Sequence, residues 1–429
     1  MLSPSLAKEK RVKTVDTSWD FRAADTKYSN HGFHSYPAMM IPQVASRLIR
    51  AYGAKAEVLL DPFMGSGTAL LEATLHQNFK KTYGIDINPL ALLIAKVKTT
   101  PIKPTLLKEE YRKFLQRCND DFRAVNFKEK AIEKPNFFNI DFWFKPQAIT
   151  DLAILKSNID KIDDESMRNF FLVAFSETVR SASNTRSNEY KLYRKSENVL
   201  KKHNPNTFLK FKENLENNLG EMEEYVKEHN KECKVNILAE DTRNKTSIAE
   251  EAVDLIVTSP PYGDSRTTVA YGQFSRLALQ WLGYSKEEVL AIDKVSLGGI
   301  PTKDLENDLE SPYLVQTLNR IIEQDPKRAR DVLSFYVDFA KCIKEIDRVT
   351  KRGAYLCFVV GNRTVKGVQI PTDDIITDLF QAQNSYKHHH TFIRNIPNKR
   401  MPKLNSPTNI KGNHAVTMNE EWIVILEKQ

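Results

Sequence analysis

A five-residue segment, 258–262 (TSPPY), places a hydroxyl, two prolines and an aromatic ring in one short stretch. It directly follows an apolar run, residues 252–257, which predicts a short buried strand. Because proline has no N–H to donate, two consecutive prolines end the strand and turn the backbone out of the sheet. Ser259 and Tyr262 then stand on a rigid loop beside two carbonyl oxygens without their usual partners. Such a loop can hold a planar amine, because oxygens accept its hydrogens and a ring covers its face.

A second candidate site is the glycine turn 61–68 (DPFMGSGT), which follows a predicted strand over 57–63. Gly65 and Gly67 allow positive φ and let a ligand approach the backbone closely. The turn is not a phosphate-binding P-loop, because the GxxxxGK[ST] spacing is absent and Thr68, not a lysine, follows Gly67.

The next predicted strand, 81–87, ends in an acid, Asp86. In nucleotide-binding α/β units an acid at this position accepts hydrogen bonds from a ribose diol. Asn88 and Pro89 then cap and begin a helix over 90–97. The succession of strand, glycine turn, helix, strand and acid therefore predicts a nucleotide-like ligand.

Composition limits the class of protein. The chain has 429 residues, of which 41% are apolar and 28% charged, as in a globular protein large enough for two domains. No apolar run is long enough to span a membrane, and the first residues lack the apolar core of a signal peptide. The four cysteines are far apart, so we expect neither a zinc site nor disulfides, no metal at all, and a cytoplasmic location. The net charge of +8 is compatible with a polyanionic partner.

The α/β pattern is interrupted once. Residues 103–232 are mostly polar with helical periodicity, as over 167–179 and 208–226. Beyond them the pattern resumes with a strand over 235–241 that ends in Asp241. Later strands are expected over 354–360 and 421–426, after a second irregular section, 283–331. Residues 1–30 are polar and predict an arm that is ordered only if it docks.

Three segments resemble those of DNA amino-methyltransferases. The glycine turn 61–68 is similar to their S-adenosylmethionine-binding motif, and TSPPY resembles their catalytic motif. The segment 34–37 (HSYP), with the helix after it, resembles the part of the family that closes the methionine pocket. The resemblance covers 31–100, 235–282 and 350–428 in pieces. It does not cover 103–232 or 285–330.

The resemblance implies a Rossmann-like three-layer α/β methyltransferase fold, with a seven-stranded, mostly parallel sheet and a mainly helical insert. The expected domains are the arm 1–30, a catalytic domain over 31–102 and 233–429, and the insert 103–232. In this family, segments such as this insert carry DNA recognition.

The resemblance also assigns roles to individual residues. The cofactor-binding residues it implies are Tyr36, Asp61, Phe63, Gly65, Gly67, Thr68, Asp86, Ile87, Asn88 and Asp241. The catalytic residues it implies are Ser259, Pro260, Pro261 and Tyr262. The Ser259 hydroxyl and the Pro260 carbonyl would accept the two amino hydrogens, and Tyr262 would stack on a base that has left the duplex.

Ser before Pro-Pro-Tyr is typical of enzymes of this family that act on cytosine N4, and Asp of those that act on adenine N6. The resemblance therefore implies a site-specific DNA methyltransferase acting on the N4 amine of a flipped-out cytosine, the modification enzyme of a restriction–modification system. The alternatives are an N6-adenine DNA methyltransferase, an RNA base methyltransferase, and a nucleic-acid-binding protein without catalysis.

Basic residues lie in three segments that we expect to contact double-stranded DNA. Residues 180–212 contain nine Lys or Arg and two Glu, with interleaved aromatic residues. Residues 394–411 contain five basic residues and no acid. The third segment, 263–268, directly follows TSPPY and contains Arg266. The individual candidates are Arg186, Lys191, Arg194, Lys195, Arg266, Lys399 and Arg400. A cognate restriction endonuclease is a further expected partner.

Overall fold

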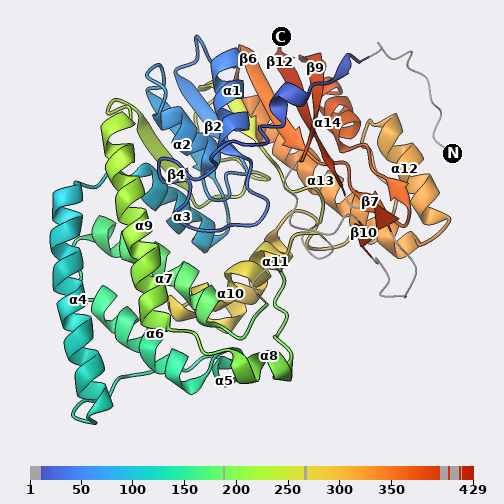
Figure 1. The fold of residues 1–429 in the computed structure, drawn as a ribbon. Helices are drawn as coiled ribbons and strands as arrows, with labels where there is room; N and C mark the ends of the chain where they lie inside the picture. Colours follow the sequence, from blue (N-terminus) through green and yellow to red (C-terminus); the bar gives the residue numbers. More distant parts are fainter. Residues whose placement is uncertain (1–10, 187–188, 265–267, 397–403, 406–414, 417) are drawn as a thin grey trace.

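The computed structural model describes residues 11–186, 189–264, 268–396, 404–405, 415–416 and 418–429. Eight strands of these ranges form one sheet in the order β1-β9-β12-β6-β5-β2-β3-β4. Helices cover both faces of the sheet, and a separate group of helices lies to one side of it (Figure 1). This is the Rossmann-like α/β architecture with a helical insert.

The sheet is mixed but mostly parallel. Its strands are β1 (Lys13–Val15), β2 (Val58–Asp61), β3 (Lys81–Ile85), β4 (Lys234–Leu238), β5 (Val253–Thr258), β6 (Thr350–Val360), β9 (Tyr386–Asn395) and β12 (Glu420–Lys428). Strand β12 is antiparallel to both neighbours, and the other adjacent pairs are parallel. Two small ribbons pair β7 (Thr364–Val365) with β8 (Val368–Gln369) and β10 (Leu404–Asn405) with β11 (Ala415–Val416).

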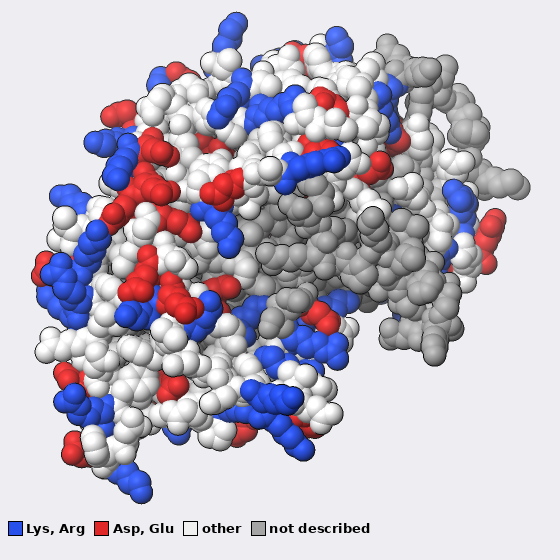
Figure 2. All heavy atoms as spheres, in the orientation of Figure 1, with Lys and Arg blue, Asp and Glu red and all other residues white. Residues whose placement is uncertain are grey.

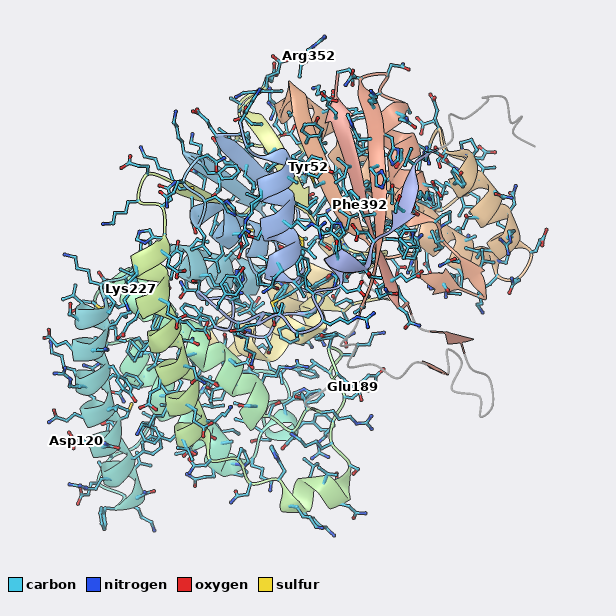
Figure 3. All side chains as sticks on the ribbon, turned by 45° about the horizontal axis from the view of Figure 1, so that its top comes forward. Tyr52, Asp120, Glu189, Lys227, Arg352 and Phe392 are labelled. Carbon is cyan, nitrogen blue, oxygen red and sulfur yellow. The ribbon has the colours of Figure 1, made fainter. Side chains whose placement is uncertain are left out.

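The expected count of seven strands is wrong by one. The additional strand, β1, comes from the segment expected to be an arm, and it pairs in parallel with β9. A ring contact and an ion pair are among the interactions that dock this segment. Trp19 is buried, with its ring centroid 5.4 Å from that of Phe392, which Figure 3 labels. Lys13 forms an ion pair of 2.6 Å with Asp373, which is itself buried.

Alternating side chains of the central strands supply two apolar layers. Leu255 and Val257 face α1 (Pro42–Tyr52) and α2 (Thr68–Thr74). Ile256 faces the opposite layer, where α12 (Pro312–Ile322), α13 (Pro326–Val349) and α14 (Thr372–Gln381) lie. A third helix, α3 (Pro89–Thr99), packs beside α2 through Ala95. The sheet is therefore the middle of three layers.

The remaining helices form one body, which we call the helical lobe. Its members are α4 (Pro104–Asn126), α5 (Ile140–Trp143), α6 (Pro146–Ile159), α7 (Glu165–Ala182), α8 (Glu197–Lys202), α9 (Thr207–Glu228), α10 (Tyr271–Trp281) and α11 (Lys286–Val295). The last two come from beyond TSPPY, yet they share the apolar core of the insert. Trp281 joins the two parts, since its ring lies 5.7 Å from Phe144 and 6.0 Å from Phe175.

The strand order reverses at the centre of the sheet. Strand β2 has β3 on one side and β5 on the other, and from both the chain proceeds outward. Such a switch point leaves a crevice at the carboxyl ends of β2 and β5, where α/β proteins bind ligands. The last residues of these strands are Asp61 and Thr258.

Candidate active site

A cavity lies at this switch point. Nine of the ten residues predicted to bind the cofactor line it: Tyr36, Asp61, Phe63, Gly65, Thr68, Asp86, Ile87, Asn88 and Asp241. Two residues of the TSPPY segment, Ser259 and Pro261, line the same cavity. The structure thus brings together segments that are about 200 residues apart in the chain, as expected for a shared site.

The glycine turn forms one side of the cavity. Gly65 has φ +50° and Gly67 has φ +81°, a region of backbone conformation that favours glycine. Gly67 does not line the cavity but begins α2, and a Cβ there would lie 2.9 Å from the Cβ of Ala95. Glycine at this position therefore allows α2 and α3 to pack closely while the turn bends toward the ligand space.

Asp86 is held by backbone amides. Gly65 N–H donates to its Oδ2 at 3.0 Å, and Asn88 N–H donates to its Oδ1 at 2.7 Å. Burial raises the pKa of this carboxyl to about 6, although these amides oppose the rise. A carboxylate has about four lone-pair sites. Each oxygen of Asp86 therefore retains capacity to accept a hydroxyl.

Asp61, the last residue of β2, is hydrogen-bonded to the end of β5. The Thr258 hydroxyl donates to Asp61 Oδ1 at 2.6 Å, and Phe63 N–H donates to the same oxygen at 3.1 Å. Burial raises the pKa of Asp61 to about 7, and both hydrogen bonds oppose the rise. Thr258 was not predicted as a site residue, although it stands first in the TSPPY motif.

Two aromatic rings, Tyr36 and Tyr271, also line the cavity, and the Tyr36 ring lies beside the glycine turn at Gly65. Asn88 Nδ2 donates to the Tyr36 hydroxyl at 3.1 Å and to Ser275 Oγ at 2.8 Å. The Tyr36 ring stacks on Tyr271 with a centroid separation of 5.9 Å. Sequence reasoning missed Tyr271 and Ser275. The sequence signal that could have indicated them is the helical periodicity of 271–281, which begins nine residues after TSPPY.

The TSPPY loop is supported by side-chain hydrogen bonds. The Ser259 hydroxyl donates to the Tyr262 hydroxyl at 3.4 Å, and Tyr262 donates to Glu421 Oε1 on β12 at 3.0 Å. Pro260 is buried beneath the loop. Burial raises the pKa of the Tyr262 hydroxyl well above its usual value, and the Glu421 carboxylate adds to the effect. Tyr262 is only partly exposed, and its hydroxyl is held by Glu421 at the start of β12.

Asp241 lines the cavity and forms an ion pair with Arg243. Arg243 Nε lies 3.0 Å from each oxygen of Asp241, and Arg243 Nη1 lies 3.1 Å from Asp338 Oδ2. The side-chain hydrogen bond with Asp241 is the main reason that the pKa of Arg243 is raised further. The acid is therefore where it was expected, but part of its acceptor capacity is used by the arginine.

The basic candidates of the helical lobe surround a short bridge between Thr185 and Arg194. Arg186 pairs with Glu189 at 3.0 Å, whereas Lys191 is partly exposed. Lys195 is turned inward, because its Nζ donates to the Ser183 carbonyl at 2.8 Å.

This segment lies against α10. Leu192 N–H donates to Gln273 Oε1 at 3.3 Å, and the exposed Tyr190 ring lies 6.3 Å from that of Phe274. Figure 3 places Glu189 at the edge of the lobe nearest the sheet. Basic side chains also gather over α8, where Lys201 and Lys202 are exposed (Figure 2).

The other three basic candidates, Arg266, Lys399 and Arg400, lie outside the described residues. Among the residues that the structure does describe, no group of three or more His, Cys, Asp or Glu side chains could hold a metal ion. A search of the same part of the chain finds no helix with the length and apolar character needed to cross a membrane.

Comparison with known proteins places the chain in a family. The family model described as DNA methylase matches residues 3–97. Type II methyltransferase M.MvaI of Kocuria varians is 43% identical over 442 residues, which cover 97% of this chain and 95% of that protein. Type II methyltransferase M.MjaII of Methanocaldococcus jannaschii is 29% identical over 33% of this chain and 27% of its own length.

A solved structure, the rRNA methyltransferase aviRa from Streptomyces viridochromogenes, aligns with 92% of this chain and 88% of its own. Its identity is 11% and its TM-score 0.30, so the two structures are only weakly similar. The match to M.MvaI runs through both the strand-end cavity and the helical lobe, nearly from end to end. The chain therefore belongs to the DNA amino-methyltransferases, among those of the type II restriction–modification systems.

Proposed function

We propose that this protein transfers a methyl group from S-adenosylmethionine to the N4 amine of a cytosine in double-stranded DNA. One observation carries the proposal: Ser259, on its proline-fixed loop, lines the same cavity as Asp86 and the glycine turn. The Ser259 hydroxyl, which can accept a hydrogen bond from an amine, and the Asp86 carboxylate, which can accept hydrogen bonds from a ribose, thus face the same cavity.

The residues of the cavity fit the cofactor. Asp86 retains acceptor capacity for two ribose hydroxyls, and Ile87 beside it offers an apolar surface for adenine. Because Gly65 has no side chain, no Cβ fills the space between the turn and the Tyr36 ring, where the methionine end would lie. Asp241, already paired with Arg243, would lie near the adenine amine. When bound, S-adenosylmethionine supplies an electrophilic methyl group on its sulfonium.

The work of the chain is positioning. An exocyclic amine on a pyrimidine is a poor nucleophile, because its lone pair is delocalised into the ring. Ser259 Oγ and the Pro260 carbonyl would accept the two amino hydrogens and hold the nitrogen toward tetrahedral geometry. Its lone pair then points along the line of transfer, and the rigid loop contributes orientation and electrostatic stabilisation.

The target base must leave the duplex, because the loop lies at the edge of a cavity rather than on an open surface. The partly exposed Tyr262 ring would then contact the flipped base. The lobe edge with Arg186, Lys191 and Arg194 would contact phosphates. Lys195, which faces inward, would support that edge instead. A nuclease with the same recognition sequence completes the proposal.

Product analysis tests the proposal. Duplex DNA methylated by the purified protein is digested to nucleosides and analysed by mass spectrometry. We expect N4-methyldeoxycytidine. N6-methyldeoxyadenosine as the only product would overturn the choice of cytosine, and 5-methyldeoxycytidine would overturn the amine chemistry. Preference for structured RNA over duplex DNA in a competition assay would overturn the proposed substrate.

A further inference from the structure

The hydrogen bonds behind Ser259 form a chain that ends in a buried ion pair. Arg394 on β9 and Glu421 on β12 lie directly opposite each other in the antiparallel register. Arg394 Nη1 lies 2.7 Å from Glu421 Oε2, and the arginine side chain is 4% exposed. From Glu421 Oε1 the chain continues through Tyr262 to Ser259.

The ion pair between Arg394 and Glu421 determines which group donates in the two hydrogen bonds that follow it. A guanidinium has only donors, and an ionised carboxylate has only acceptors. Glu421, paired with Arg394, must therefore accept the hydrogen of the Tyr262 hydroxyl at 3.0 Å. Tyr262 has no second hydrogen, so its oxygen can only accept from Ser259, at 3.4 Å. The Ser259 hydrogen thus points away from the cavity that Ser259 lines.

The position of the Tyr262 ring depends on a glycine at the end of β6. A Cβ on Gly361 would lie 2.8 Å from Tyr262 Cδ2. Because Gly361 has no side chain, the ring can cross the end of β6, the strand that lies between β5 and β12 in the sheet. The hydroxyl thereby reaches Glu421, which is 159 residues away in the chain.

We propose that Glu421 is a positioning residue, which acts through Tyr262 to present the Ser259 oxygen to the substrate amine as a hydrogen-bond acceptor. This inference rests on the proposed amine transfer. A serine hydroxyl can also donate, and in that orientation it would bind the nitrogen lone pair that must attack the methyl group. The buried pair with Arg394 disfavours this orientation, because it leaves Tyr262 no hydrogen to give and so makes its oxygen an acceptor for the Ser259 hydrogen.

The substitution Glu421→Gln tests the direction of the chain. Arg394 can only donate, so it would bind the amide oxygen of the glutamine and turn the amide N–H₂ toward Tyr262. Tyr262 would then donate to Ser259, and Ser259 would donate into the cavity. We expect kcat at saturating DNA and S-adenosylmethionine to fall about 10- to 100-fold, the rate equivalent of one or two hydrogen bonds. Cofactor affinity measured by calorimetry should change little. The unfolding midpoint should fall, because the substitution leaves the buried Arg394 without its charged partner, so kcat is compared at a temperature where both proteins are folded.

A double-mutant cycle separates this role from general support of the fold. Phenylalanine at position 262 keeps the ring but cannot donate to Ser259. Tyr262→Phe should therefore lower kcat less than Glu421→Gln, and the double variant should match Tyr262→Phe alone. Glu420→Gln is the matched control, since it removes the same charge from the adjacent residue, which faces the other side of β12.

Three results would overturn the proposal: an unchanged kcat in Glu421→Gln, losses that multiply in the double variant, or an equal loss in Glu420→Gln. If Glu421→Gln fails to fold, Tyr262→Phe decides alone, and an unchanged kcat with a normal unfolding midpoint overturns the proposal. Wild-type protein that transfers no methyl group to DNA would overturn the proposed function and this inference together. Wild-type protein that methylates adenine would overturn only the choice of base, since either amine needs an acceptor.

Discussion

The two halves of the cavity are built differently. In the cofactor half, the partners of Asp86 are backbone amides 21 and 2 residues away, and both belong to the same strand–turn–helix unit. In the amine half, Ser259 and Tyr262 depend on Glu421, which lies 159 residues from Tyr262. Backbone amides stay in place when side chains change, whereas a chain of side chains needs every member. We therefore expect the cofactor half to govern binding and the amine half to govern transfer.

The largest expected effect comes from a substitution in the amine half, at Ser259. Ser259→Ala removes one acceptor of the amino hydrogens, so kcat should fall about 10²- to 10³-fold, as for loss of one donor from an oxyanion hole. Methyl transfer to duplex DNA at saturating substrates measures the change. Ser334→Ala is the control, because it deletes another buried hydroxyl, one that donates to the Asp331 carbonyl at 2.8 Å within α13. A similar loss in both variants would remove the special role of Ser259.

A smaller effect tests the glycine turn. In Gly67→Ala, the left-handed backbone and the short distance to Ala95 should together lower the free energy of unfolding by about 2–4 kcal/mol. The matched control is Gly353→Ala. Gly353 has φ +77° but no atom within 4 Å of an added Cβ, so only the backbone cost of about 1–2 kcal/mol applies. Chemical denaturation measures both, and equal losses would show that close packing is not what requires Gly67.

The pH dependence of cofactor binding sharpens the comparison further. Burial raises the pKa of Asp86 to about 6, and the ionised form is the one that accepts ribose hydroxyls. Cofactor affinity should therefore fall about tenfold between pH 8 and pH 5, by linkage to one proton. The folded state favours the protonated form of Asp86. Its contribution to the free energy of unfolding should therefore increase as the pH falls below about 6.

Calorimetry at several pH values measures the binding change. Asp61 also faces this cavity, and burial raises its pKa to about 7. The control is therefore Asp86→Asn, which keeps Asp61 and should bind the cofactor weakly with a flatter profile near pH 6. The same pH step in wild type and Asp86→Asn would assign the titration to another group.

The smallest expected effect concerns the lobe edge. Lys191→Ala should weaken DNA binding by about 3- to 10-fold on every sequence and reduce the salt slope by about 0.9, as for one lost phosphate contact. Lys227→Ala is the control, because Lys227 is exposed on α9, away from Glu189 in Figure 3. Equal effects of the two substitutions would indicate only a change of net charge.

The same contrast explains what the sequence could predict. The segment from Asp61 to Asn88 is one local unit with a known succession of elements, so seven of its eight predicted residues line the cavity and only Gly67 does not. Glu421 could not be predicted, because its partner is chosen by the order of β5, β6 and β12 in the sheet. Tyr271 was missed for a similar reason, since only tertiary packing brings α10 against Tyr36.

The fold shows the same limit. Strands with continuous apolar runs overlap the expected ranges: β5 is shifted by one residue from 252–257, and β6 contains 354–360 but begins four residues earlier. Strand β1 does not, because its three residues are all exposed and its place is set by pairing with β9 and by ion pairs to α14. Likewise, α10 and α11 belong to the lobe through Trp281, although their position in the chain suggested the catalytic domain.

The central claim, that one half of the cavity binds and the other transfers, is tested most directly by single-turnover methyl transfer at graded cofactor concentrations. Ser259→Ala should lower the plateau rate by about 100-fold or more with an unchanged half-saturating concentration. Asp86→Ala should raise that concentration at least about tenfold and keep most of the plateau. If both variants changed the same parameter by similar factors, the division of the cavity into two halves would be contradicted.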